Sequence, residues 1–237
     1  MKPRFFLFLF AGLALISCRT NEGGSDNRFS EEKTIEGVSR LQIKGVFNLH
    51  LTQSDNESLT IDGSPELAEK LNVTQQGDLL ILEMEEFNTS FFDKKDLKVN
   101  LAISNLEEFQ FDGVGNIQTT GTFIVDKVKI LGEGVGNLEM DFQTTELDAE
   151  LNLVGKLTLR GKSTKVSIRN EGIGNIDASQ LIAQDMDVRS SGIGKMDVHC
   201  EGNLSMVVEG IGKVTYSGNP NVIKKEISGI GKVEAKE

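Results

Sequence analysis

A four-residue pattern of glycine, an aliphatic residue, glycine, and asparagine or lysine recurs along the second half of the chain. A decayed copy, Leu153-Val154-Gly155-Lys156, fills the one gap in the series, and successive copies begin 18 to 21 residues apart. A fixed period near 20 residues predicts a solenoid, in which each repeat adds one coil to the previous one. The glycines of the intact copies are Gly113 and Gly115, Gly134 and Gly136, Gly172 and Gly174, Gly192 and Gly194, Gly210 and Gly212, and Gly229 and Gly231.

Apolar and polar residues alternate on both sides of each copy, as in Leu138-Glu139-Met140 directly after the second one. This two-residue period predicts strands with one buried face. Equivalent residues recur in the same chain direction, so neighbouring coils should pair in parallel, with the right-handed winding usual for parallel crossovers. The predicted fold is all-β, a right-handed parallel β-helix of about seven coils that forms a rod roughly 30 to 35 Å long. An antiparallel sandwich with glycine turns is the alternative.

The residue between the two glycines is Val or Ile in every copy, and we interpret this column as part of the core. The interpretation requires Ile173, Ile193 and Ile211 to point inward, so the chain must bend or bulge at the glycines. The fourth position should face outward, because lysine occupies it in several copies. Asn116 and Asn137 should then stack as a hydrogen-bonding ladder.

The first 17 residues have the features of a signal peptide, with a short basic start and an apolar run too short to cross a bilayer. The run Leu-Ile-Ser-Cys that ends at Cys18 resembles the lipobox of bacterial lipoproteins. That resemblance implies cleavage after residue 17 and acylation of Cys18, and several acyl chains on one residue anchor a protein firmly to a membrane. An ordinary secretory signal is the alternative. Residues 18–32 are polar and glycine-containing, which predicts a flexible tether.

Residues 33–106 are rich in strand patterns but less periodic, and residues 107–237 form the glycine-repeat β-helix of the same continuous domain, 33–237. We expect antiparallel strands in 33–106 and one short helix over 65–71. We also expect this region to cap the rod, because an open solenoid end exposes apolar surface and strand edges. At the other end, charge could protect the last coil. Without that protection, copies of the chain could associate end to end. The lysines available there are Lys225, Lys232 and Lys236.

Several of these segments together resemble one known family. They are Ile-Lys-Gly-Val-Phe ending at Phe47, Pro-Glu-Leu-Ala from Pro65, Leu-Leu-Ile-Leu from Leu79, and the Gly-Val-Gly-Asn-Ile repeats. The chain resembles the family described as "putative auto-transporter adhesin, head GIN domain", which is common among Bacteroidetes lipoproteins. The resemblance covers about residues 35–237 and implies a β-helical fold. It implies no established catalytic residues that could be assigned to positions of this chain.

Charge and cysteine content narrow the choice of partners. The formal net charge is −11, and it becomes −13 once the signal peptide with Lys2 and Arg4 is removed. So acidic a surface disfavours binding to nucleic acid and to anionic lipid. If Cys18 is acylated, Cys200 has no disulfide partner within the chain. We expect a half-buried thiol there, in preference to a metal pair with the adjacent His199.

Catalytic patterns are sparse. Neither G-x-G-x-x-G nor G-x-x-x-x-G-K-[ST] occurs, so both nucleotide-binding readings fail. Asp177 and Asp197 should lie about 5 Å apart on neighbouring coils. Together with Glu171 and Lys195 they could bind Ca²⁺ or sugar, although a solvated acidic face explains the same pattern. We assign no catalytic residue, metal ligand or cofactor.

These features favour a non-enzymatic, envelope-anchored lipoprotein that acts as an adhesin-like binding or structural module. The expected partners are the membrane, through acylated Cys18, and a protein or polysaccharide ligand of unknown identity, but not nucleic acid. Two alternatives stay open: a carbohydrate-active β-helix enzyme that uses the acidic columns, and a scaffold that self-assembles through the C-terminal coil. The expected location is the outer membrane, with either the periplasmic or the surface leaflet possible.

Overall fold

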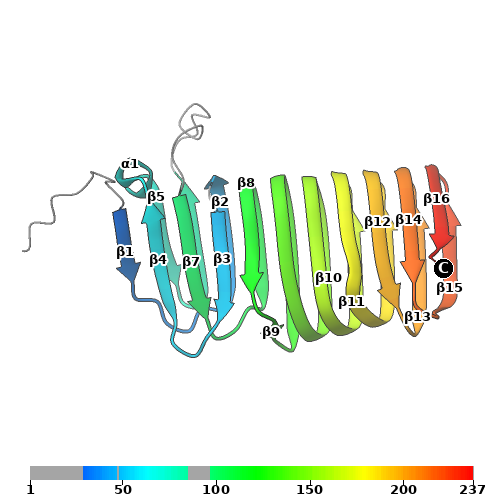
Figure 1. Ribbon diagram of the computed structural model, residues 1–237, viewed down its shortest axis with the longest axis horizontal. Coiled ribbons are helices and arrows are strands. Elements are labelled where there is room, and N and C mark those ends of the chain that lie inside the picture. The colour runs from blue at the N-terminus through cyan, green and yellow to red at the C-terminus, as the bar shows by residue number, and fades with distance from the viewer. Residues whose placement is uncertain (1–28, 47, 85–96, 237) are drawn as a thin grey trace, which may run out of the picture.

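The computed structural model of this 237-residue chain describes residues 29–46, 48–84 and 97–236. They form a single sixteen-stranded sheet that winds into a parallel β-solenoid of about 6 turns (Figure 1). The predicted parallel solenoid is therefore confirmed, with slightly fewer coils than the seven expected. Cys18 and the tether up to residue 28 lie outside the described residues, as does the whole segment between the sixth and seventh strands, residues 85–96.

The glycine repeats form the regular part of the solenoid, and every strand pairing within it is parallel. Equivalent glycines lie opposite each other in register, for example Gly115 with Gly136 and Gly174 with Gly194. The strands are β8 (Glu108–Thr120), β9 (Phe123–Ile124), β10 (Lys127–Asn170), β11 (Ile173–Ser190), β12 (Ile193–Cys200), β13 (Asn203–Val208), β14 (Ile211–Ser217), β15 (Asn221–Ile227) and β16 (Ile230–Ala235).

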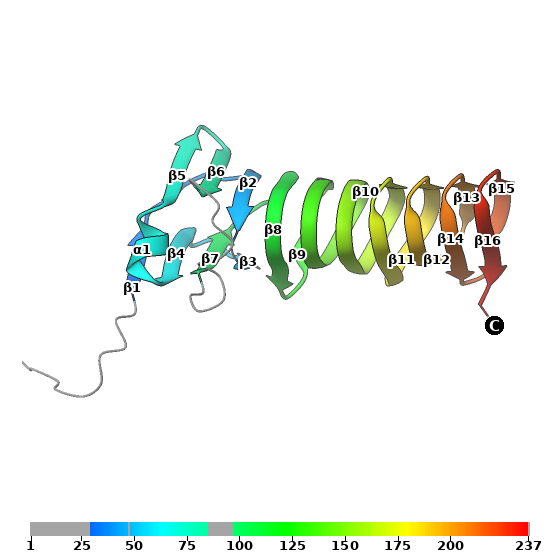
Figure 2. The ribbon, with the colours of Figure 1, turned by 90° about the horizontal axis from the view of Figure 1, so that it is seen from above.

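The N-terminal elements close one end of the solenoid. They are β1 (Phe29–Lys33), β2 (Arg40–Val46), β3 (Asn48–Gln53), β4 (Ser58–Gly63), α1 (Pro65–Ala68), β5 (Leu71–Gln76), β6 (Leu79–Met84) and β7 (Leu97–Ile103). The expected antiparallel pairing occurs in β1–β4, β4–β7 and β5–β6, and Figure 2 shows β5 and β6 set apart from β4 and β7. The helix is shorter than expected.

Strands β2 and β3 correct the expectation of antiparallel pairing for this whole region. Both run parallel to β8, and Gly45 and Val46 lie in register with Gly113 and Val114. The run Gly45-Val46-Phe47-Asn48 is a near-copy of the glycine motif, and this register makes its segment a coil of the solenoid. The glycine repeat therefore begins well before residue 107.

The hydrophobic core fills the interior of the tube. One inward column runs through Ile130, Ala149, Ile168, Val188 and Met206, and each of these side chains is fully buried. Near the cap the core contains phenylalanines. The rings of two of them, from β9 and β10, pack with centroids 6.2 Å apart. The buried side chains at this end are Phe109, Phe111, Phe123 and Phe142.

The aliphatic residue between the glycines does not belong to this core, so that interpretation was wrong. Ile173, Ile193 and Ile211 are about half exposed, at 52%, 46% and 50%. The inward–outward alternation continues unbroken through the corner, because the first glycine takes the inward position. The decayed copy demonstrates this: Leu153 replaces that glycine and is only 6% exposed, whereas Val154 after it is 48% exposed.

Close approach between coils explains the glycines. Gly194 has φ +145°, which side chains rarely adopt, and a Cβ added there would overlap the carbonyl oxygen of Gly174 one coil earlier. A Cβ on Gly212 would overlap Gly194 in the same way. Beyond the glycines, the Asn116–Asn137 ladder is confirmed, with an Nδ2 to Oδ1 distance of 3.0 Å.

Candidate functional site

Three surfaces of the solenoid carry candidate chemistry. The strands that follow each glycine motif, including β12, β14 and β16, form one sheet, which we call the front sheet (Figure 1). The strands that precede each motif, including β13 and β15, form the opposite back sheet. The two sheets meet at the glycine corners, where the exposed aliphatic residues form a line that we call the aliphatic ridge. It consists of Val114, Val135, Val154, Ile173, Ile193, Ile211 and Ile230.

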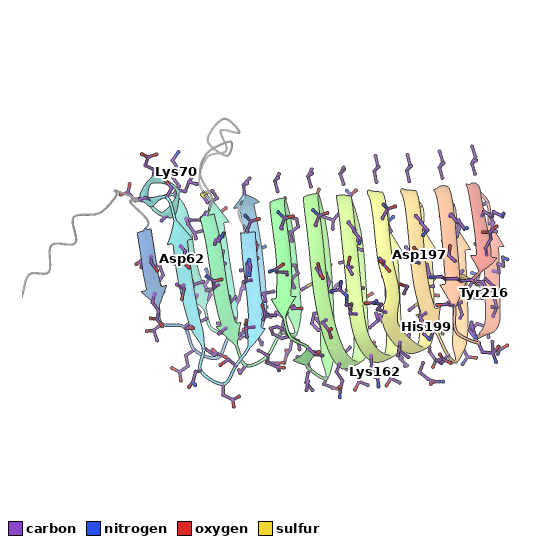
Figure 3. All side chains as sticks on the ribbon, in the orientation of Figure 1. Asp62, Lys70, Lys162, Asp197, His199 and Tyr216 are labelled. Atoms are coloured by element: carbon purple, nitrogen blue, oxygen red, sulfur yellow. The ribbon has the colours of Figure 1, made fainter. Side chains whose placement is uncertain are left out.

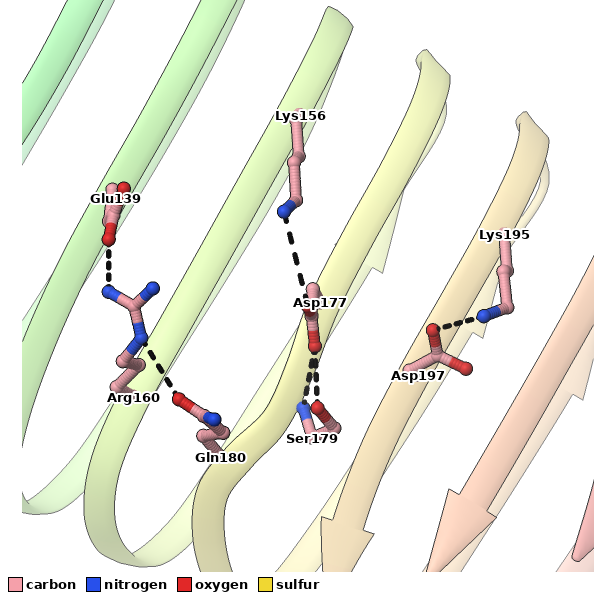
Figure 4. Close-up of polar contacts among 8 residues, drawn as sticks. All are labelled: Glu139, Lys156, Arg160, Asp177, Ser179, Gln180, Lys195 and Asp197. Atoms are coloured by element: carbon pink, nitrogen blue, oxygen red, sulfur yellow. Dashed lines mark hydrogen bonds and ion pairs between the residues drawn. The ribbon is translucent and has the colours of Figure 1, made fainter. Parts of the chain in front are cut away.

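The front sheet holds three of the four residues expected to form a Ca²⁺ or sugar site, but not Glu171. Asp177 and Asp197 do lie in register on neighbouring coils. Asp177 Oδ1 accepts hydrogen bonds from Ser179 Oγ at 2.7 Å and from Ser179 N at 3.3 Å, whereas Asp197 Oδ2 lies 2.6 Å from Lys195 Nζ (Figure 4). Glu171 instead precedes its glycine motif and lines a groove on the back sheet. The expected cluster is therefore not assembled.

The charged side chains of the front sheet form ion pairs and hydrogen bonds with neighbouring side chains. The hydrogen bond from Ser179 lowers the pKa of Asp177, and the bond to Asp197 raises the pKa of Lys195. Figure 4 also shows Arg160 joined to Glu139 of the preceding coil. Among the described residues no three His, Cys, Asp or Glu side chains are grouped as metal ligands would be. The front sheet is thus an ordered array of ion pairs.

The structure brings together one Ser-His-Glu set that sequence reasoning missed. His199 Nδ1 lies 2.9 Å from Ser217 Oγ, and His199 Nε2 lies 2.6 Å from Glu201 Oε1. Ser217 Oγ donates its proton to the carbonyl of Val198 at 3.2 Å. Because this hydroxyl proton points to a main-chain carbonyl, Ser217 is held as a hydrogen-bonding link between two coils and is not aligned as a nucleophile. Sequence spacing hides this set because Ser217 lies one coil further along.

Cys200, beside this histidine, is a structural thiol. Its side chain is fully buried, and Sγ lies 3.4 Å from the carbonyl oxygens of Gln184 and Asn203. Burial raises the pKa of the thiol, which keeps it protonated and unreactive near neutral pH. The residue is more deeply buried than the half-buried thiol that we expected.

The back sheet contains a groove of about 560 Å³ that sequence reasoning also missed. We call it the back groove. It crosses successive coils, so its length follows the solenoid axis. Buried apolar side chains contribute to its lining, and four acidic and two basic groups surround them. The lining residues are Glu146, Leu147, Asp148, Lys165, Val166, Ser167, Arg169, Asp185, Met186, Asp187, Asn203, Ser205 and Ile223.

Hydrogen bonding distinguishes one carboxylate in the back groove from the others. Asp185 Oδ1 accepts from the backbone N and the Nδ2 of Asn203, at 3.0 and 2.9 Å. Asp187 Oδ2 accepts from Ser205 Oγ at 2.8 Å. Asp148 Oδ1 is buried and has no hydrogen-bond partner in the described part of the chain. A buried acceptor without a donor is costly, so this oxygen is suited to a donor supplied by a ligand.

The only sequence signal for this groove is weak. Ser167, Asp187 and Ser205 occupy one column in the strands before the glycine motifs, where the register of the coils places them side by side. Asp148 holds the equivalent sequence position one repeat earlier. Sequence reasoning concentrated on the column after the motifs. The polar columns before and after the glycine motifs both alternate with apolar residues, so the pattern alone does not show which of the two sheets contains a groove.

The C-terminal coil has a partial cap. Lys225 lies in register with Met206 at the inward column, and its Nζ lies 3.2 Å from the carbonyl oxygen of Val233 on the opposite sheet. Lys213 and Lys232 both pair with Glu234 and lower its pKa to about 2. Among the described strands, β15 pairs only with β13, and β16 only with β14, so each leaves one edge unpaired.

The chain belongs to the family described as "putative auto-transporter adhesin, head GIN domain", whose model matches residues 38–220. The match covers most of the chain, including most of the cap and of the glycine repeats, and it confirms the resemblance seen in the sequence. The adhesin description points to a binding module with an envelope or surface location. No curated protein matches the chain. Among the described residues, no helix has the length and apolar character needed to cross a membrane.

Solved structures share this fold. A putative adhesin from Bacteroides fragilis NCTC 9343 superimposes with a TM-score of 0.82 at 23% identity, over 90% of this chain and 98% of that one. A putative lipid binding protein from Parabacteroides distasonis ATCC 8503 gives a TM-score of 0.68 at 19% identity, over 90% and 98%. A putative adhesin from Parabacteroides merdae ATCC 43184 gives 0.59 at 19% identity, with the same coverage. At these identities the similarity establishes the fold alone.

Proposed function

We propose that the protein is a non-enzymatic, membrane-anchored binding module that holds an extended, donor-rich ligand in the back groove. The unsatisfied Asp148 Oδ1 is the observation that carries this proposal. The adhesin family supports the general class, and the groove gives that class a location on the molecule. A polysaccharide lying along the solenoid axis fits the groove, because its hydroxyl groups can donate to successive coils.

The fold suits such a role because the groove is built on paired strands. Its floor contains Val166 and Met186, which are buried, so the surrounding side chains rest on packed core. Sites built on regular elements hold their geometry better than sites on loops. Lys165 and Arg169 on the same lining can also donate to ligand oxygens. The groove therefore offers both acceptors and donors along one line.

Titration of the protein with a panel of neutral and amino polysaccharides tests the binding role. Residues 25–237 are suitable, because every buried core residue lies between Ile35 and Val233. Asp148→Asn should weaken binding at least about tenfold, because it removes the charge that accepts the ligand's donor. Asp197→Asn on the opposite sheet is the matched control and should bind normally. Equal binding by both variants, or no binding to any polymer, would refute the groove assignment.

The same panel separates a binding module from a carbohydrate-active enzyme. A binding module retains each polysaccharide without shortening it. Chain cleavage that disappears in Asp177→Ala or Asp197→Ala would overturn the non-enzymatic proposal. We expect no cleavage, because the front-sheet carboxylates are already committed to Ser179 and Lys195.

The proposed anchor is acylated Cys18, which would hold the protein at the bacterial outer membrane. The chain has two cysteines, so a matched pair of variants is available. Labelling with a radioactive fatty acid in the native host should mark the wild type and Cys200→Ala but not Cys18→Ala. Label that remains on Cys18→Ala would refute the anchor. Protease treatment of intact cells then distinguishes the surface leaflet from the periplasmic one.

Self-assembly through the C-terminal coil is a second candidate, favoured by the unpaired edges of β15 and β16. Ile223 and Ile230 are 63% and 79% exposed at this end. Two copies could pair their last coils. Light scattering across a range of protein concentrations should then show a dimer, and Ile223→Lys should abolish it. A monomer at every concentration would refute this candidate.

A further inference from the structure

The aliphatic ridge lies outside the hydrophobic core, yet it is uninterrupted. Over seven successive glycine motifs its residue is always Val or Ile, with exposures between 45% and 79%. The flanking glycines carry no side chains that could cover it, and Leu153, which replaces one of them, is buried. Figure 3 shows side chains standing in a row above the upper edge of the ribbon, where the two sheets meet. Continuous apolar surface of this kind marks an interaction site.

We propose that the aliphatic ridge is a membrane-contact edge, which inserts into the interfacial region of a lipid bilayer. The proposal is separate from the ligand role of the back groove, because the ridge lies at the corner between the sheets. Its occupant follows from shape, area and charge.

Shape and area favour a lipid surface over a second copy of the chain. The ridge presents one residue per coil, and its exposed area is on the order of 600 Å². Stable protein interfaces bury about 800 Å² on each partner and need complementary surfaces. Two copies would offer each other the same convex line and would touch only along it. A bilayer deforms, so its acyl region can surround a narrow ridge from both sides.

The charged residues on both sides of the ridge are suited to the head-group region of a bilayer. Lys156 and Lys195 follow the ridge by two positions, and their side chains are 51% and 52% exposed. Long lysine side chains can place their stems beside apolar surface and their amines among phosphates. On the other flank, Glu133, Glu171 and Glu209 precede the glycine motifs and are exposed. Charges of both signs favour a zwitterionic bilayer over a strongly anionic one.

The proposed anchor would place the ridge within reach of the membrane. Ten residues separate Cys18 from the first described strand, and a tether of that length spans at most about 35 Å. That is about the length of the repeat region, so the solenoid could lie flat on the bilayer. In the cell this geometry rests on acylation of Cys18, but affinity of the ridge for lipid does not.

Vesicle co-sedimentation of unacylated residues 25–237 tests the ridge alone. The probe is small vesicles of phosphatidylcholine and phosphatidylethanolamine, without any polysaccharide. The double variant Ile173→Ser, Ile193→Ser should bind at least about tenfold more weakly than wild type, because it removes two apolar contacts from the ridge. The control Ile124→Ser, Ile182→Ser removes similar exposed surface elsewhere, at 62% and 43% exposure, and should bind as wild type does.

Three results would overturn the proposal. The first is a wild type that stays in the supernatant at millimolar lipid. The second is an equal loss of binding in the ridge and control variants, which would indicate nonspecific adsorption. The third is a lipid-independent dimer, seen by light scattering, that the ridge variant abolishes and Ile223→Lys does not. That result would assign the ridge to a second copy of the chain. Neither failure nor success here depends on ligand binding in the back groove.

Discussion

Substitution of a corner glycine is the most direct test of how the coils stack. In Gly194→Ala the new Cβ must occupy a backbone with φ +145°, which costs roughly 1 to 3 kcal/mol. It also overlaps the carbonyl oxygen of Gly174, so two coils must separate locally, at roughly 1 to 3 kcal/mol more. We expect the free energy of unfolding to fall by about 4 kcal/mol. Guanidinium denaturation followed by circular dichroism measures this loss.

Gly121→Ala is the matched control, because Gly121 has φ +78° but nothing lies within 4 Å of an added Cβ. Only backbone strain should act there, at about 1 to 2 kcal/mol. The difference between the two variants therefore isolates the contact between coils. If Gly194→Ala lost no more stability than Gly121→Ala, close contact between neighbouring coils would not be the reason that glycine is required at position 194.

Three further predictions concern other parts of the molecule. Ile173→Ser should change the free energy of unfolding by less than about 0.5 kcal/mol, whereas Ile176→Ala should cost about 2 to 4 kcal/mol, because only Ile176 is buried; thermal denaturation of both decides this. The Arg40 guanidinium lowers the pKa of Asp78 to about 2, below its unfolded value near 4. The stability from this pair is therefore complete above pH 4 and lost as the pH falls through 2, and the Tm difference between wild type and Asp78→Asn should shrink over that range. Cys200 should react with a maleimide slowly in the native protein and rapidly in denaturant; fast native labelling would contradict its burial.

The sequence determined the architecture because its signal is repeated. A single glycine-aliphatic-glycine motif says little, but copies at a nearly constant spacing can be satisfied together only by coils that stack in register. The inward column through Ile130, Ile168 and Met206 and the stacking of Asn116 on Asn137 both follow from that register. These features depend on position within the repeat, which is visible in the sequence.

Only the tertiary structure decided which way the chain faces at the corners and where its surface is hollow. The alternation of apolar and polar residues does not show whether the residue between two glycines points inward or outward, because the glycines have no side chains that mark a buried or an exposed position. Ile173 was assigned to the core for that reason, and the structure turns it outward because the first glycine takes the inward position. The back groove, Asp148 within it, and the pairing of His199 with Ser217 depend on how coils lie beside one another in space. Sequence order does not contain that information, since residues that touch across coils are separated by an entire turn of the solenoid.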